Sequence, residues 1–84
     1  MYVFLISAST RTLKLDFYDS AVVVAKSYTD ASTILPNGSD EKCSEKEDLT
    51  HGSWCRRSQV KVKCIGEAAA MMKRGVVCAS FNAA

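Results

Sequence analysis

Cysteine is the residue type in this chain that most readily does chemistry, and four cysteines occur among the 84 residues. Structural zinc sites normally take pairs of cysteines about two to four residues apart, because one turn then supplies two ligands. At least eight residues separate neighbouring cysteines here, so the spacing does not predict a zinc site. The four residues are Cys43, Cys55, Cys64 and Cys78.

The cysteines fall into two kinds of setting. Cys64 and Cys78 occupy apolar positions of predicted strands, where we expect them to be buried as small hydrophobic side chains. Cys43 and Cys55 lie in or beside a polar segment, and the sequence does not decide their role. A disulfide could join them in an oxidising compartment, whereas a bacterial or eukaryotic cytosol would keep them reduced. A metal site formed by these two cysteines and His51 fits the usual ligand spacings poorly.

No catalytic motif emerges from the remaining residues. His51 is the only histidine, and a Cys–His nucleophile would require it to be held rigidly against Cys43 or Cys55. The sequence contains no phosphate-binding P-loop and no glycine-rich dinucleotide motif. We therefore expect no catalytic residues, no metal and no cofactor, in a protein that is not an enzyme.

Charge is distributed unevenly along the chain, although the net charge is only +2. Residues 1–39 carry three basic and three acidic groups, and residues 49–84 carry six basic groups and one acid. Tryptophan and arginine are enriched at the energetic centres of protein interfaces. We therefore predict a partner-binding surface in a basic group that falls within ten residues of the sequence. Its members are Trp54, Arg56, Arg57, Lys61 and Lys63. The alternative is a solvated sheet face whose tryptophan covers the edge of the core.

A polar loop at about residues 37–53 contains the acidic part of the chain. Residues 40–48 hold five acids and two lysines, and Leu49 is the one large apolar residue nearby. A long loop in a compact domain is either functional or mobile. We predict that its carboxylates, chiefly Glu45, Glu47 and Asp48, form a second contact surface for a basic partner.

The segment from about residue 59 to residue 81 is predicted to run strand, helix, strand. Val60, Val62 and Cys64 alternate with Lys61 and Lys63, which is the period of a strand with one wet face. The helix formers that follow predict a helix at about 66–74, closed by a glycine at residue 75. Residues 76–81 are apolar on both faces and predict a central strand, reached by a right-handed crossover parallel to the first.

The first half of the chain predicts a meander of strands at residues 2–8, 12–18 and 21–28, with a turn at 19–20 and another at 36–38. A capped helix over 21–28 is the alternative. Together these elements predict one compact α+β domain over residues 1–84. Its sheet would be mostly antiparallel with four to five strands, and one helix would pack on one face. The opening MYVFLIS has no basic leader and is too short to span a membrane, so we expect a cytoplasmic protein.

The overall pattern resembles small phage-encoded anti-CRISPR proteins that act on type I CRISPR-Cas surveillance complexes. The resemblance is carried by MYVFLIS, RTLKLDFY, AVVVAKSY and the closing KCIGEAAAMMKRGVVCASF. It implies a non-enzymatic inhibitor that docks on a type I effector complex in the host bacterial cytoplasm and blocks DNA binding or nuclease recruitment. No shared motif fixes an alignment, so the resemblance assigns no functional residues. The chain departs from acidic DNA mimics, because its net charge is positive.

A small nucleic-acid-binding phage or bacterial regulator is the alternative function. Bases could stack on Trp54 or Tyr2 while the lysines follow the phosphate backbone. A net charge of +2 is low for a dedicated nucleic-acid binder, and the acidic loop would repel phosphate.

Overall fold

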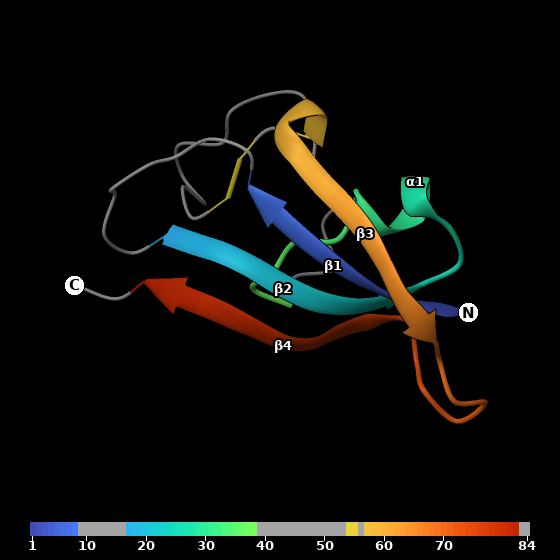
Figure 1. Ribbon diagram of the computed structural model, residues 1–84. Coiled ribbons are helices and arrows are strands. Elements are labelled where there is room, and N and C mark those ends of the chain that lie inside the picture. The colour runs from blue at the N-terminus through green and yellow to red at the C-terminus, as the bar shows by residue number, and fades with distance from the viewer. Residues whose placement is uncertain (9–16, 39–53, 56, 83–84) are drawn as a thin grey trace.

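The computed structural model describes residues 1–8, 17–38, 54–55 and 57–82 of the chain. Four antiparallel strands form one sheet in the order β3-β1-β2-β4 (Figure 1). The prediction of an α+β domain with a mostly antiparallel sheet of four to five strands is confirmed. The elements are β1 (Tyr2–Ala8), β2 (Phe17–Ala25), α1 (Tyr28–Ala31), the 3-10 turn η1 (Arg57–Gln59), β3 (Val60–Glu67) and β4 (Gly75–Asn82).

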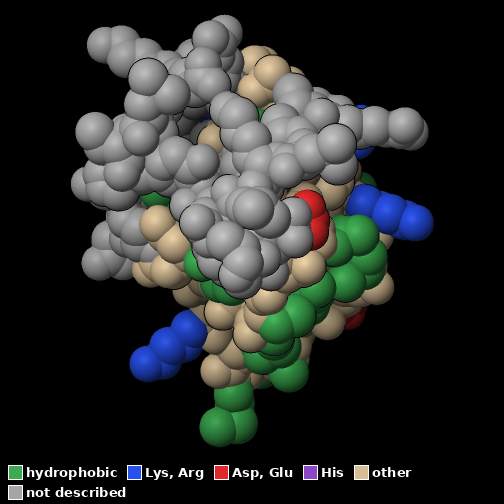
Figure 2. All heavy atoms as spheres, turned by 90° about the vertical axis from the view of Figure 1, so that its left-hand side faces the viewer, with side chains coloured by type: hydrophobic (Ala, Val, Ile, Leu, Met, Phe, Trp, Pro, Cys, Tyr) green, Lys and Arg blue, Asp and Glu red, His purple; other side chains and the backbone are tan. Residues whose placement is uncertain are grey.

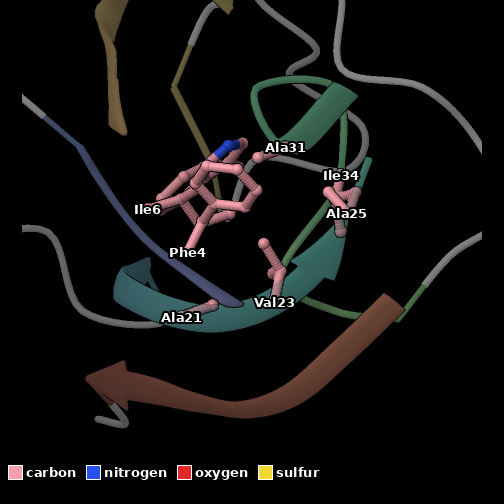
Figure 3. Packing of buried hydrophobic residues seen from close by; sticks show 8 residues of the cluster. Phe4, Ile6, Ala21, Val23, Ala25, Ala31 and Ile34 are labelled. Carbon is pink, nitrogen blue, oxygen red and sulfur yellow. The ribbon is translucent and has the colours of Figure 1, made fainter. Parts of the chain in front are cut away.

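Alternating side chains give the sheet one face that packs into the core. Phe4 and Ile6 of β1 lie opposite Val23 and Ala21 of β2, and all four are almost fully buried. These residues are spaced by two, so their side chains point to the same side of the sheet. Figure 3 shows them gathered between the sheet and the segment around α1. The central position predicted for the first strand is confirmed, because β1 lies between β3 and β2.

The helix α1 is a single turn that closes this core. Ser27 caps it, since the Ser27 Oγ accepts a hydrogen bond from the Asp30 backbone nitrogen at 3.1 Å. Ala31 at its end is fully buried, and Ile34 just beyond is 6% exposed. Both join the cluster formed by Phe4, Ile6 and Val23. One short helix therefore packs over part of the apolar face of the sheet, together with Ile34 and Trp54.

The helix predicted at about 66–74 is wrong. β3 continues to Glu67, β4 begins at Gly75, and the seven residues between them form a turn without helix. β3 and β4 occupy opposite edges of the sheet, three strand spacings or roughly 14 Å apart. Seven residues in an α-helix would span only about 10 Å. The connection is instead a loop with a turn in which the Met72 backbone nitrogen donates to the Ala69 carbonyl oxygen at 2.9 Å, and Met71 at its tip is 94% exposed rather than packed on the sheet.

The parallel crossover predicted for the last two strands is also wrong. Each of the four strands is antiparallel to its neighbours, and β4 is an edge strand rather than a central one. β4 carries no charged residue on either face, although several of its residues are exposed. In the sequence it therefore looks like a buried strand, which explains the prediction of a central position. Gly75 does adopt a positive φ of 138°, as a glycine can, but it starts β4 instead of ending a helix.

The structure of β2 differs from the turn predicted at residues 19–20 and decides between a strand and a helix over residues 21–28. The strand runs without a break from Phe17 to Ala25, so the turn predicted at Asp19-Ser20 is wrong. Asp19 is accommodated by a bulge, because Tyr18 pairs with Phe81 and Ser20 pairs with Ser80. The strand interpretation of residues 21–28 is confirmed as far as Ala25. Residues 12–16 of the second predicted strand lie outside the described part of the chain.

The turn predicted at residues 36–38 is confirmed. The Gly38 backbone nitrogen donates to the Leu35 carbonyl oxygen at 3.1 Å, and Gly38 has a φ of 79°. Among the described residues, no helix is long and apolar enough to cross a lipid bilayer.

Candidate interaction surface

Two lysines stand on the face of β3 that points away from the core. Lys61 and Lys63 are exposed, whereas Val60, Val62 and Cys64 between and beside them are half-buried and pack against the core cluster. This is the alternation that the sequence predicts, and it is confirmed. Side chains two residues apart on one face of a strand are separated by about 7 Å. The two ammonium groups can therefore reach one ligand surface together.

The lysines border a groove of about 470 Å³, called here the lysine groove, lined by Leu5, Ser7, Lys61, Val62 and Lys63. Strand register places Lys61 across from Ser7 and Lys63 across from Leu5. The groove thus offers two cations, a hydroxyl and an apolar side chain within one small area. Lysine stems can lie along apolar surface while their ammonium groups stay in water. This combination fits a partner surface that presents carboxylates beside an apolar residue.

Hydrophobic side chains are also visible on the surface of the domain. On the face drawn in Figure 2 they form a continuous patch, and basic side chains project on either side of it. On the other side of the domain, Tyr2 next to the N-terminus and Tyr28 in α1 are exposed at 46% and 57%. Both pack edge-on against the buried ring of Phe4, with centroid separations of 6.3 and 5.1 Å. These contacts hold the two tyrosine rings in place at the surface.

Arg57 lies on the other side of the sheet from the two lysines. Its Nε donates a hydrogen bond of 3.4 Å to the Ser32 Oγ, just after α1, and the side chain is half-buried. β3 begins at Val60, so Arg57 in η1 does not continue the exposed face of that strand. The predicted basic surface is therefore divided. Lys61 and Lys63 form one face, whereas Arg57 joins η1 to the segment that follows α1.

Trp54, predicted as a partner contact, is a member of the core, so little of its side chain is left at the surface. It is 9% exposed and packs in the cluster of Phe4, Ile6, Ala31 and Ile34. A large aromatic ring gains more from burial than from solvent exposure. This burial agrees with the alternative that the sequence left open, in which the tryptophan covers the edge of the core.

Four of the predicted contact residues lie outside the described part of the chain. They are Arg56 and the acidic residues Glu45, Glu47 and Asp48. Cys43 and His51 also lie outside it, so neither the disulfide nor the metal hypothesis that uses them is tested. Of the described cysteines, Cys64 packs against the core as predicted, but Cys78 is exposed and its predicted burial is wrong. The described residues contain no group of three or more possible metal ligands.

An ion pair that the sequence did not reveal joins α1 to the β3–β4 connection. The Arg74 guanidinium donates to both carboxylate oxygens of Asp30, with the shortest N–O distance at 2.8 Å. The Asp30 Oδ2 also accepts from the Lys26 backbone nitrogen, and Arg74 reaches the Thr33 hydroxyl. The hydrogen bond from Arg74 lowers the pKa of Asp30, and the same bond raises the pKa of Arg74. The pairing fixes the end of the sheet at which β4 begins.

The described residues thus place two lysines, a hydroxyl and an apolar side chain together on one face of the sheet. No protein-family model, curated protein or solved structure matches this chain.

Proposed function

We propose that this protein is a non-enzymatic inhibitor that binds another protein through the lysine groove. The observation that carries the proposal is the placement of Lys61 and Lys63 beside Leu5 on the sheet face that points away from the core. Charged groups at an interface accelerate encounter and select partners of opposite charge. A partner with acidic side chains around an apolar one would complement this surface.

The partner that we propose is a type I CRISPR-Cas effector complex. The proposal is supported by the small single α+β domain and by the resemblance to anti-CRISPR proteins. An inhibitor of this kind acts by occupying a site on the effector, so that target DNA cannot bind or the nuclease cannot be recruited. The basic groove requires that the occupied site be an acidic or mixed protein surface, and not a site built for the DNA backbone.

Direct binding of nucleic acid is the competing function, and the structure weakens one of its supports. Stacking of bases needs an exposed aromatic ring, and Trp54 is buried in the core. Tyr2 remains exposed, but strand order places it at the opposite end of β1 from the lysine groove. Phosphate contacts from two lysines would give binding that falls steeply as salt is raised.

The test is a pull-down with the purified protein as bait, from bacterial lysate that contains assembled type I complexes, with and without nuclease treatment. We expect the effector complex to be retained after nuclease treatment. The variant Lys61→Glu/Lys63→Glu should lose retention. The control Lys26→Glu/Lys73→Glu makes the same change in net charge at exposed lysines elsewhere, and it should retain the complex.

Each outcome of the pull-down has a definite meaning. Capture that disappears with nuclease treatment would replace the proposal with nucleic-acid binding. Failure to retain any effector complex would contradict the proposed partner. Retention by both double variants would show that the partner binds through another surface than the lysine groove.

A further inference from the structure

β4 is an edge strand whose side chains lie mostly in solvent. Val77 is 52% exposed, and Cys78, Ala79 and Ser80 are exposed as well. Of the described side chains on β4, Val76 is the one that packs against the core cluster. The strand pairs with β2 on one side, and within the described chain no strand lies along its other side. Its outer row of backbone donors and acceptors is thus available to a further strand.

The two edges of the sheet differ in charge. β3 carries Lys61 and Lys63, and lysines on an edge strand are a common way to oppose the addition of another strand. β4, with the sequence GVVCASFN, carries no charged residue. Register shifts occur at both edges, once between β1 and β3 at Ile65 and twice between β2 and β4, at Val77 and at Asp19 of β2, so the presence of a bulge does not by itself distinguish the two edges. The uncharged edge is therefore the one at which a further strand can add.

We propose that β4 pairs antiparallel with β4 of a second copy of this chain, forming a dimer with twofold symmetry. The irregularity at Val77 leaves Cys78–Asn82 as the regular part of the strand. A twofold axis through its centre places Ser80 opposite the partner's Ser80. Every opposing pair in this register is uncharged. The same operation on β3 would place lysine opposite lysine, which destabilises a strand pair.

In the dimer the two sheets join into one, and the lysines of the two copies lie far apart. Two sheets joined at β4 would have eight strands, which is within the usual range for one sheet. Both copies of β3 would then lie at the far ends, so the lysine faces would be separated by the full width of the sheet. Both lysine grooves would remain open. The inference does not depend on the proposed inhibitor function, because it uses a different edge and needs no other protein.

The test is sedimentation velocity of the purified protein over a series of concentrations. A single pair of short strands buries little surface, so we expect a reversible equilibrium in which the average mass rises from one copy toward two. Ser80→Lys places like charges opposite each other at the twofold axis. Because such charges repel across an interface, we expect self-association weaker by about tenfold or more.

A matched variant and a mixing experiment make the test specific. Ser58→Lys adds the same charge at an exposed serine in η1, far from β4 in the sheet order, and should dimerise like the parent. Ser80→Glu should be as weak as Ser80→Lys, and an equal mixture of the two should dimerise again. A loss of fold would not be repaired by mixing.

A measurement on the unmodified chain covers the case in which the lysine variant fails to fold. Amide hydrogen exchange of residues 78–82 should slow as the protein concentration is raised, while exchange in β3 should stay constant. A parent protein that remains monomeric up to its solubility limit would overturn the proposal. A dimer that persists unchanged in Ser80→Lys, or concentration-dependent protection confined to β3, would overturn it as well.

Discussion

Replacing Trp54 by alanine should destabilise the domain strongly, because the structure places this side chain in the core rather than on a binding surface. It is 9% exposed and packs against the cluster that includes Phe4, Ile6 and Ile34. Truncation of a buried tryptophan removes its apolar contacts and leaves a cavity that the surroundings fill only in part.

The size of the effect can be estimated from the length of the chain. Domains gain about 0.05–0.15 kcal/mol of stability per residue, so 84 residues correspond to roughly 4–13 kcal/mol. Truncating a buried Phe or Trp to Ala typically costs about 3–5 kcal/mol. Trp54→Ala should therefore lose between a quarter of the stability and all of it. For a domain of this size that corresponds to a melting temperature lowered by about 12 °C or more. Trp54→Phe should fall between the alanine variant and the parent.

Urea unfolding followed by circular dichroism compares the variants directly. In the parent, fluorescence of the single tryptophan should shift to longer wavelength in the same transition. Met71→Ala is the matched control, because Met71 is 94% exposed and its truncation should change the free energy of unfolding by less than about 0.5 kcal/mol. An unchanged urea midpoint for Trp54→Ala would refute the placement of Trp54 in the core and restore it as a possible contact residue.

Two further predictions concern the end of the sheet at which β4 begins. A double-mutant cycle with Asp30→Asn and Arg74→Gln should give a coupling of about 0.5–1 kcal/mol, kept small because the Arg74 side chain is 40% exposed to solvent. The pairing lowers the pKa of Asp30, so its stabilisation is complete above the unfolded-state pKa and is lost as pH falls through the folded-state pKa. Acid should therefore cost the parent more stability than it costs Asp30→Asn, and equal losses would contradict the pairing. Gly75→Ala should cost about 1–3 kcal/mol because φ is 138°, whereas Gly66→Ala, at a negative or extended φ with open space around it, should be nearly neutral. Equal urea midpoints for the two glycine variants would contradict that backbone geometry.

Strand alternation was the part of the fold that could be predicted from sequence. Lys61 and Lys63 alternate with Val60 and Val62. When one face of a sheet is buried, a period of two places the apolar residues on that face and the polar residues on the other. The exposed lysine pair followed from that pattern without any knowledge of the neighbouring strands. The groove beside it did not follow, because Leu5 comes from a strand far away in the sequence.

The connection between β3 and β4 shows where local propensity fails. Alanine and methionine at residues 68–72 favour a helix, and the sequence signals at its two ends agree. A helix of about eight residues is marginal in water unless its apolar face is packed. Here the connection must reach from one edge of the sheet to the other, and strand order cannot be read from the segment itself. Tertiary topology therefore overrode a local preference.

Burial of single residues was the least predictable property of the candidate site. Cys78 was expected to be buried but is exposed on the edge strand β4, and of the two alternatives for Trp54 the structure shows the one in which it packs in the core. The partner of Arg74 could not be predicted either, since Asp30 is 44 residues away along the chain. Such contacts depend on which elements pack together, and the spacing of residues within one segment does not predict this.

The central claim is that the lysine groove binds an acidic surface of a type I effector complex. Its most direct test is the affinity of the purified, nucleic-acid-free complex for the parent and for the two lysine double variants, measured by titration in moderate salt. We predict that Lys61→Glu/Lys63→Glu binds more weakly by about tenfold or more, which is about 1.4 kcal/mol or more. We expect Lys26→Glu/Lys73→Glu to bind like the parent. Equal affinity of all three proteins, or no binding by the parent, would contradict the claim.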